Sequence, residues 1–185
     1  MMVSITLHAH DTIKSFYNPN MVALDMTIGR GNDTLFLAKH CHKVFGFDIQ
    51  EEAFKSTENL LLSHNIKNVE LIFDSHEKIS KYVKEAFSIA IFNLGYLPKA
   101  SKIITTKEDV TLRTLKDTLK LISEPGLIVL TLYVGHEEGQ KEALSIEEYV
   151  KTLSSTDYSV VKYQILNRNK SPYNMYIYKD KRRKK

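Results

Sequence analysis

Cysteine is almost absent from this chain of 185 residues, which contains only Cys41. A single thiol excludes an internal disulfide and a cysteine metal cluster. Long apolar runs are missing too, since no stretch approaches the roughly 18 to 20 residues that a membrane helix needs. The first residues, MMVSITLHAHDTIKSF, lack the charged start and apolar block of a signal peptide. We therefore expect a cytoplasmic protein with no metal site and no membrane anchor.

The composition is that of a globular protein, with 43% hydrophobic residues and a formal net charge of +4. Part of this charge lies in the basic tail KDKRRKK, residues 179–185. Such a tail is either a solvated, disordered end or an arm that attracts nucleic-acid phosphates, and charge alone does not decide between them. We find no repeat and no linker, so residues 1–185 are expected to form one domain.

Apolar runs alternate with helical patterns along most of the chain. The expected strands are 21–24, 44–47, 69–73, 87–92 and 127–133, and the expected helices are 33–40, 51–64 and 109–122. After residue 145 the pattern predicts a helix at 146–153 and two strands, 158–166 and 173–178, joined by a loop short enough for an antiparallel pair. This order predicts an α/β fold, an open and mostly parallel seven-stranded sheet with a C-terminal antiparallel strand.

Two glycines, Gly29 and Gly31, follow the first expected strand in the segment LDMTIGRGNDT, residues 24–34. Ligands of open α/β sheets bind at the carboxyl ends of the strands. Glycine there allows a tight turn and a close approach of the backbone to a ligand. A plain strand-to-helix turn is the simpler alternative, because two glycines are a weak signal.

The residues around these glycines favour one of two cofactor classes. A dinucleotide fingerprint has a third glycine, where this chain has Thr34, and Asp33 would repel a pyrophosphate at the start of the helix. S-adenosylmethionine has no phosphate and carries sulfonium and ammonium charges, which suit Asp25 and Asp33. The loop therefore favours S-adenosylmethionine over NAD.

Polar residues also end the second and third expected strands. Asp48 can accept hydrogen bonds from both ribose hydroxyls of either cofactor class. Asp74, Ser75 and His76 form a polar cluster at the depth expected for an adenine ring. The alternative is that Ser75 or Asp74 simply caps the next helix.

The fourth expected strand runs into Asn93, which is followed by Leu94, Gly95 and Tyr96. The amide oxygen of Asn93 can accept from an amino group and so aim its lone pair at a methyl donor. Tyr96 can stack on a flat base. The alternative is a turn in which Tyr96 only packs.

These motifs together resemble the YtqB-like (MnmM) family. The matching segments are Ala9-His10, 25–34, 47–50, 74–77, 92–98, 104–106, 132–139 and 165–172. Members are similar to class I, Rossmann-like S-adenosylmethionine-dependent enzymes, and they methylate the aminomethyl group of 5-aminomethyl-2-thiouridine at the wobble position of tRNA. The resemblance implies the same fold, cofactor and reaction here, with the anticodon region of tRNA as partner. The oligomeric state stays open, with a homodimer as one option.

The resemblance also implies roles for individual residues. The residues expected around the methionine part of the cofactor are Asp25, Thr27, Gly29, Gly31, Asn32, Asp33 and Thr34. Those expected at the ribose and adenine are Asp48, Ile49, Gln50, Ser75 and His76. Those expected to face the substrate amine are Asn93 and Tyr96. Those expected at the rim of the substrate pocket are His10, Tyr133, His136 and Asn167.

The chain departs from the family pattern at three places. Arg30 stands where the family usually has asparagine, Ser75 where it has glycine, and Ser171-Pro172 where it has two prolines. Three other functions stay open: methylation of a ribosomal RNA base amine, an NAD-dependent oxidation, and RNA binding without catalysis. Asp33 and Thr34 disfavour the second, and the cofactor-like turns disfavour the third.

Overall fold

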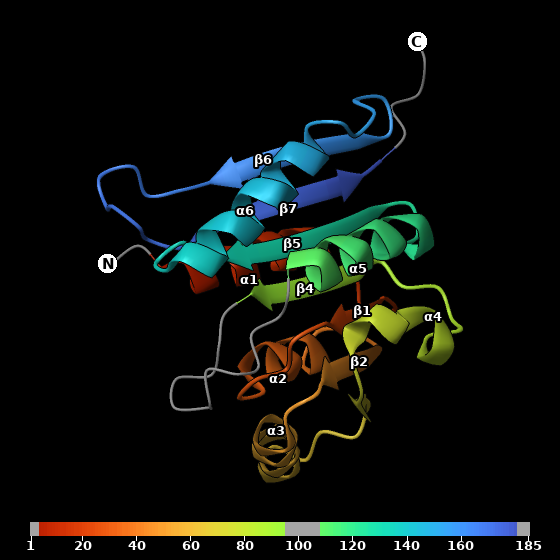
Figure 1. Cartoon of the computed structure of the whole chain (residues 1–185). Helices are drawn as coiled ribbons and strands as arrows, with labels where there is room; N and C mark the ends of the chain where they lie inside the picture. The colour runs from red at the N-terminus through yellow and green to blue at the C-terminus, as the bar shows by residue number, and fades with distance from the viewer. Residues whose placement is uncertain (1–3, 95–107, 181–185) are drawn as a thin grey trace.

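A β-sheet with the strand order β3-β2-β1-β4-β5-β7-β6 forms the centre of the molecule (Figure 1). The structure is a computed structural model that describes residues 4–94 and 108–180, and within these residues the sheet has seven strands. Their bounds are β1 Val22–Asp25, β2 Lys43–Asp48, β3 Val69–Phe73, β4 Ile89–Leu94, β5 Gly126–Leu132, β6 Tyr158–Tyr163 and β7 Tyr173–Lys179.

Strands β1 to β5 pair in parallel, whereas β7 pairs antiparallel with β5 on one side and β6 on the other. The central strands β4 and β5 are buried along nearly their whole length, as expected for a parallel sheet that is covered on both faces. The predicted mostly parallel sheet with a C-terminal antiparallel strand is confirmed.

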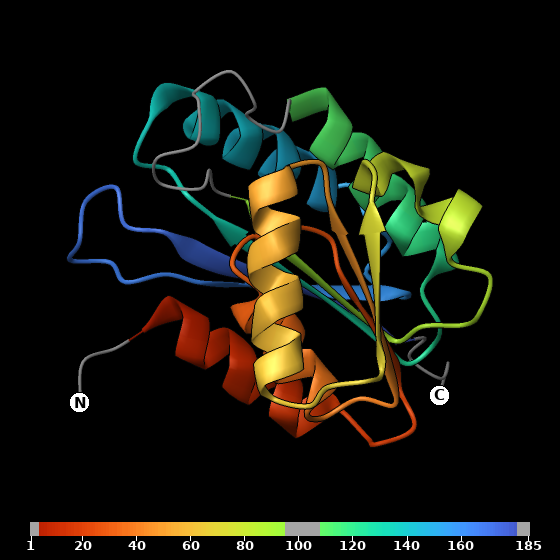
Figure 2. The same ribbon diagram turned by 90° about the horizontal axis from the view of Figure 1, so that it is seen from below.

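Helices cover both faces of the sheet (Figure 2). Their bounds are α1 Ile5–Phe16, α2 Asn32–Ala38, α3 Glu51–Ser63, the 3-10 turn η1 His76–Lys78, α4 Ile79–Tyr82, α5 Glu108–Leu121 and α6 Glu137–Val150. One core lies between the sheet and helices α4, α5 and α6, and the other between the sheet and helices α1 and α2. None of the helices in the described ranges has the length and apolar character needed to cross a membrane.

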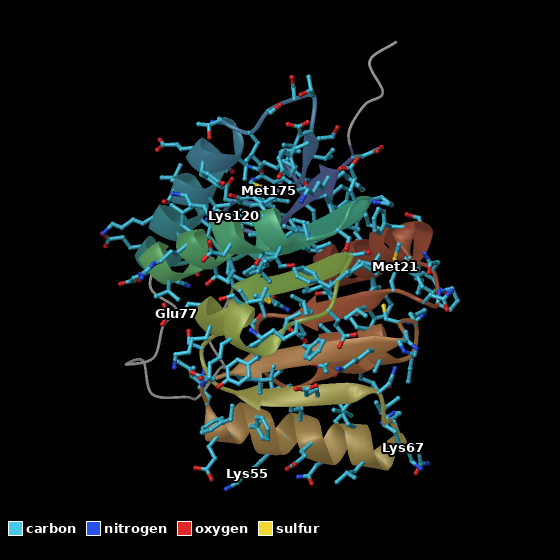
Figure 3. All side chains as sticks on the ribbon, turned by 90° about the vertical axis from the view of Figure 1, so that its right-hand side faces the viewer. Met21, Lys55, Lys67, Glu77, Lys120 and Met175 are labelled. Carbon is cyan, nitrogen blue, oxygen red and sulfur yellow. The ribbon has the colours of Figure 1, made fainter. Side chains whose placement is uncertain are left out.

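The amino ends and the carboxyl ends of the parallel strands lie on opposite sides of the molecule, here called the amino edge and the carboxyl edge of the sheet. Figure 3 shows Met21 and Lys67, which precede β1 and β3, toward one side of the molecule, and Glu77, which follows β3, toward the other. The carboxyl ends of β1 to β6 share this second edge, because these strands all point the same way. We therefore expect the predicted site residues to lie at this carboxyl edge.

Several features differ from the sequence-based expectation, among them the bounds of β4, which is Ile89–Leu94, and of β6, which ends at Tyr163. Helix α1 was not predicted, although Ser4 caps it and Ile5, Ala9 and Ile13 bury one face at helical spacing. Helix α6 begins at Glu137, nine residues before the predicted start. The first turns of this helix are polar, so the apolar pattern did not indicate them. Lys179 was assigned to the basic tail, yet it ends β7 and its Nζ donates to two carbonyl oxygens at the end of α5.

Candidate active site

The loop between β1 and α2 adopts a conformation that only glycine takes readily. Gly29 has a φ of 51° and Gly31 a φ of 82°, both in the left-handed region. Gly31 also precedes α2 as its N-cap, and a Cβ atom there would lie 3.0 Å from Thr57 Cα in α3. The backbone conformation and the close approach of α3 therefore both require glycine at position 31.

Asp25, the last residue of β1, holds this loop from inside. Its carboxylate is fully buried and accepts from Thr34 Oγ1 at 2.6 Å and from the Thr27 backbone N–H at 3.1 Å. Burial, together with the nearby charge of Asp33, raises the pKa of Asp25 to about 7. Asp25 thus ties the end of β1 to the first turn of α2, and a direct contact with a cofactor stays a prediction.

Asp48 lies at the neighbouring strand end and fixes the other side of the loop. Its two carboxylate oxygens accept from the backbone N–H groups of Gly29, at 3.1 Å, and Gln50, at 3.0 Å. Burial raises the pKa of Asp48 above its ordinary value. The next residue, Ile49, is half exposed and provides an apolar surface beside this carboxylate. This arrangement fits the predicted roles of Asp48 and Ile49 at a ribose and an adenine.

Asp33 stands at the centre of a hydrogen-bonded cluster that joins three elements. One oxygen lies 2.7 Å from His10 Nε2 of α1, and the other accepts from Asn93 Nδ2 of β4 at 3.0 Å. The ring of His10 stacks on Phe36 with 3.8 Å between centroids. Asp33, which was predicted on the cofactor side, therefore also contacts two residues predicted on the substrate side.

These bonds fix the orientation of the Asn93 side chain. Since Nδ2 donates to Asp33, the amide oxygen Oδ1 is the end that can accept from an approaching amine. The backbone of Asn93 is held as well, because its N–H donates to Thr27 Oγ1 at 2.9 Å and its carbonyl accepts from the same hydroxyl at 3.2 Å. Burial and the charge of Asp33 raise the pKa of Tyr133, the residue after β5, so its phenol is neutral at pH 7.

The segment after β3 combines a helix cap with a buried histidine. Ser75 is the N-cap of η1, and its Oγ accepts from the Glu77 backbone N–H at 3.4 Å, so the capping alternative applies to Ser75. His76 Nδ1 lies 2.9 Å from Thr114 Oγ1, whose own hydrogen is donated to the Val110 carbonyl. His76 therefore carries its proton on Nδ1, which leaves Nε2 as a hydrogen-bond acceptor. Burial lowers the pKa of His76 to about 4, so the ring is neutral at pH 7.

The remaining predicted residues that the structure describes are His136, Asn167 and Asn32. His136 is the N-cap of α6 and accepts from the Gly139 backbone N–H at 3.0 Å. Asn167 is exposed in the loop between β6 and β7, and Asn32 is exposed in the first turn of α2. Tyr96 and the matching segment 104–106 lie outside the described residues. No group of three metal-ligating side chains was found among residues 4–94 and 108–180.

The structure adds residues that sequence reasoning missed. Phe36 supports the His10 ring, Thr57 packs against Gly31, and Thr114 sets the tautomer of His76. Nothing in the sequence marks these three positions, because each acts through a residue far away in the chain.

Comparisons with known proteins agree with this architecture. The model of a family described as "Putative rRNA methylase" matches residues 44–179. The tRNA (mnm(5)s(2)U34)-methyltransferase, chloroplastic, of Arabidopsis thaliana is 33% identical over 92% of this chain and 68% of its own length.

Solved structures give the same result. A protein from Streptococcus mutans described as "a putative methyltransferase", in complex with SAH, is 39% identical with a TM-score of 0.90, covering 97% of this chain and 99% of that one. A protein from Clostridium thermocellum described as "putative rRNA-methylase" is 32% identical with a TM-score of 0.92 at the same coverage. The predicted class I methyltransferase fold is confirmed. The chain therefore belongs to this rRNA methylase family, the YtqB-like (MnmM) family of class I methyltransferases that its motifs predicted.

Proposed function

We propose that this protein transfers a methyl group from S-adenosylmethionine to the aminomethyl group of 5-aminomethyl-2-thiouridine at the wobble position of tRNA. The relative from Arabidopsis thaliana carries this activity in its name. The observation in this chain that supports it most directly is the bond from Asn93 Nδ2 to Asp33, which leaves an amide oxygen at the end of β4 to hold an amine.

The residues at the carboxyl edge fit a cationic cofactor without phosphates. Asp25, Asp33 and Asp48 gather around one glycine loop: Asp25 accepts from Thr27 and Thr34, Asp48 accepts from Gly29, and Asp33 lies in the first turn of α2. A pyrophosphate would be repelled there, whereas a sulfonium and an ammonium group would be attracted. When bound, S-adenosylmethionine supplies an electrophilic methyl group.

We assign the parts of the cofactor as the sequence predicted. The loop residues Thr27, Gly29, Gly31 and Asn32, with the acids beside them, would hold the methionine part. Asp48 would accept from the ribose hydroxyls, and Ile49 would cover the adenine. The acceptor Nε2 of His76 suits the exocyclic amino group of adenine.

The chain would handle the substrate by positioning it. Only a neutral amine has the lone pair that attacks a methyl group, and Asn93 Oδ1 can accept one N–H and so set its direction. As the carbon–nitrogen bond forms, the bond between the methyl carbon and the sulfonium sulfur would break, and positive charge would move from sulfur to nitrogen. The Asp33 carboxylate beside Asn93 stabilises that charge. Precise alignment of the two reactants accounts for most of the expected rate enhancement.

The wobble position lies in the anticodon, so the anticodon region of tRNA would approach the carboxyl edge of the sheet. The protein would act either as a monomer or as a homodimer. Light scattering with and without tRNA measures the oligomeric state.

A methylation assay tests the function. Bulk tRNA whose wobble uridines carry an unmethylated aminomethyl group is incubated with labelled S-adenosylmethionine, digested and analysed as nucleosides. The label should appear in 5-methylaminomethyl-2-thiouridine and be lost with Asn93→Ala. Label in ribosomal RNA, with tRNA untouched, would contradict the assigned substrate.

A further inference from the structure

We infer that the loop between β6 and β7, residues 164–172, is an RNA-docking surface whose Arg168 and Lys170 bind phosphates of nucleotides that flank the methylated one. This inference rests on the proposed function, because it names how the RNA of that reaction is held. It concerns a part of the molecule that does not belong to the cofactor loop or to the Asp33 cluster.

The register of the sheet places this loop at the same level as the reacting centre. Asn93 pairs with Thr131, Thr131 with Asn174, and Asn174 with Tyr163, the last residue of β6. Neighbouring strands are about 4.8 Å apart, so the loop begins roughly 14 Å from Asn93 along the sheet. The loop therefore begins where it can contact RNA beside the target nucleotide.

The loop between β6 and β7 lies on the same side of the molecule as the candidate active site. In Figure 1 the loop extends beyond the end of β6, on the side to which β4 also points. In Figure 2 the loop and helix α1 lie on the same side of the molecule. Helix α1 is the element that brings His10 to Asp33. The loop and the site thus face one common surface.

The two cations of the loop are available to a ligand. Arg168 and Lys170 are exposed, and neither forms an ion pair with any residue in the described ranges. Lys162 on the adjoining strand shows the contrast, since Glu147 holds it at 2.6 Å. Two unpaired cations close together on an exposed loop are attractive to a polyanion, and RNA phosphates are the polyanion that this reaction requires.

The loop has a defined shape, which limits the ordering needed on binding. Its turn is held by the Arg168 backbone N–H, which donates to the Ile165 carbonyl at 3.3 Å, and by Ser171 Oγ, which donates to the Arg168 carbonyl at 3.0 Å. At the base of the loop, the ring of Tyr163 stacks on His8 of α1 with 3.5 Å between centroids. The cations therefore sit on a framework that is tied to the helix carrying His10.

Phosphate contacts position an RNA without reading its sequence. Removing these two cations should therefore weaken tRNA binding and raise the KM for tRNA. The turnover number and the affinity for S-adenosylmethionine should stay unchanged, because both depend on residues at the ends of β1, β2 and β4 and not on this loop. Each lost contact with a single-stranded phosphate should also reduce the slope of log affinity against log salt by about 0.7.

The test compares Arg168→Gln/Lys170→Asn with the charge-matched control Lys39→Gln/Lys67→Gln. Asparagine suits position 170, whose φ is 57°, and the control residues are exposed at the amino edge of the sheet. The affinity of full-length protein for tRNA is measured by fluorescence anisotropy at several salt concentrations, with cofactor affinity measured by calorimetry. We expect about tenfold weaker tRNA binding and a slope shallower by about 1.4 for the loop variant alone.

Equal losses in both variants, or an unchanged loop variant, would overturn the docking surface while leaving tRNA methylation intact. If the loop variant instead loses affinity for ribosomal RNA, and the unaltered protein methylates ribosomal RNA but not tRNA, the docking surface stands and the proposed substrate fails. The same set of proteins therefore tests the docking surface and the proposed substrate independently.

Discussion

Asn93 Nδ2 lies 3.0 Å from one carboxylate oxygen of Asp33, and the other oxygen of Asp33 lies 2.7 Å from His10 Nε2. The bond between Asp33 and Asn93 joins the first turn of α2 to the end of β4, and it leaves Oδ1 as the end of the Asn93 amide that does not bind this carboxylate. The carboxylate has a second effect, because it raises the pKa of Asp25 beneath the loop. One side chain thus links the predicted cofactor side of the site to the predicted substrate side.

Replacing Asn93 by alanine should abolish methyl transfer while the dissociation constant for S-adenosylmethionine changes by no more than a few-fold. A contact that is made fully only in the transition state lowers turnover more than binding. Single-turnover assays and calorimetry on the same preparation measure both quantities. A variant with near-normal turnover would remove Asn93 from the active site.

Replacing Asp48 by alanine should weaken binding of S-adenosylmethionine by about 1 to 3 kcal/mol, the range for leaving hydrogen-bonding groups unpaired. The Gly29 and Gln50 N–H groups would also lose their acceptor. Calorimetry with S-adenosylmethionine and with NAD is the measurement, and Asp117→Ala, which removes an exposed carboxylate on α5, is the control. Tight binding of NAD without binding of S-adenosylmethionine would refute the cofactor assignment.

Replacing Arg30 by asparagine, the residue usual in the family, should change cofactor affinity by only a few-fold. Arg30 is exposed between Gly29 and Gly31, and the backbone on either side keeps its conformation. Calorimetric titration of the two proteins side by side is sufficient. A tenfold loss of affinity would show that the Arg30 side chain holds the cofactor.

Replacing Gly31 by alanine should destabilise the fold by at least about 1 to 2 kcal/mol, the cost of a left-handed conformation for a residue with a Cβ. The same change should weaken cofactor binding, because Thr57 in α3 must move away from the new methyl group. Gly135→Ala is the matched control, since a Cβ there meets no atom within 4 Å. Thermal unfolding of the three proteins measures the difference, and equal midpoints would contradict the expectation.

Replacing His76 by glutamine should cost stability at neutral pH and cost less as the pH falls. The pKa of His76 is about 4 in the fold against an ordinary 6.5, so between these values the unfolded chain binds the proton more readily. Acid therefore erodes the stability that His76 contributes, over the window from about pH 6.5 down to 4. The free energy of unfolding is measured for both proteins at about pH 7.5, above the window, and at about pH 6, 5 and 4.5, within it.

Asp25 acts in the opposite direction, because its pKa is raised from 3.8 to about 7 and the folded state binds the proton more readily. Its contribution to stability is lost as the pH rises from 3.8 to about 7. The wild-type profile alone therefore mixes two opposing effects, and the difference between wild type and His76→Gln isolates one of them. A difference that does not depend on pH would contradict the buried, neutral histidine.

Much of the fold could be predicted because its signals are local. Apolar runs that stop at Asp25, Asp48 and Asn93 marked three strand ends, and these residues do lie at or next to the carboxyl ends of their strands. Helix α1 was missed although its signal was present, since Ser4 and the spacing of Ile5, Ala9 and Ile13 indicate a capped amphipathic helix. The sequence therefore contained the information needed to predict this helix.

The contacts within the site were decided by tertiary structure. Asp33 meets His10 of α1 across 23 residues and Asn93 across 60, and the second contact depends on β4 lying beside β1. His76 meets Thr114 across 38 residues, which sets its tautomer. Residue types and local spacing determined which groups stand at the strand ends. Strand order and helix packing decided which of them touch, because a hydrogen bond between distant residues requires a separation of about 3 Å that local patterns do not specify.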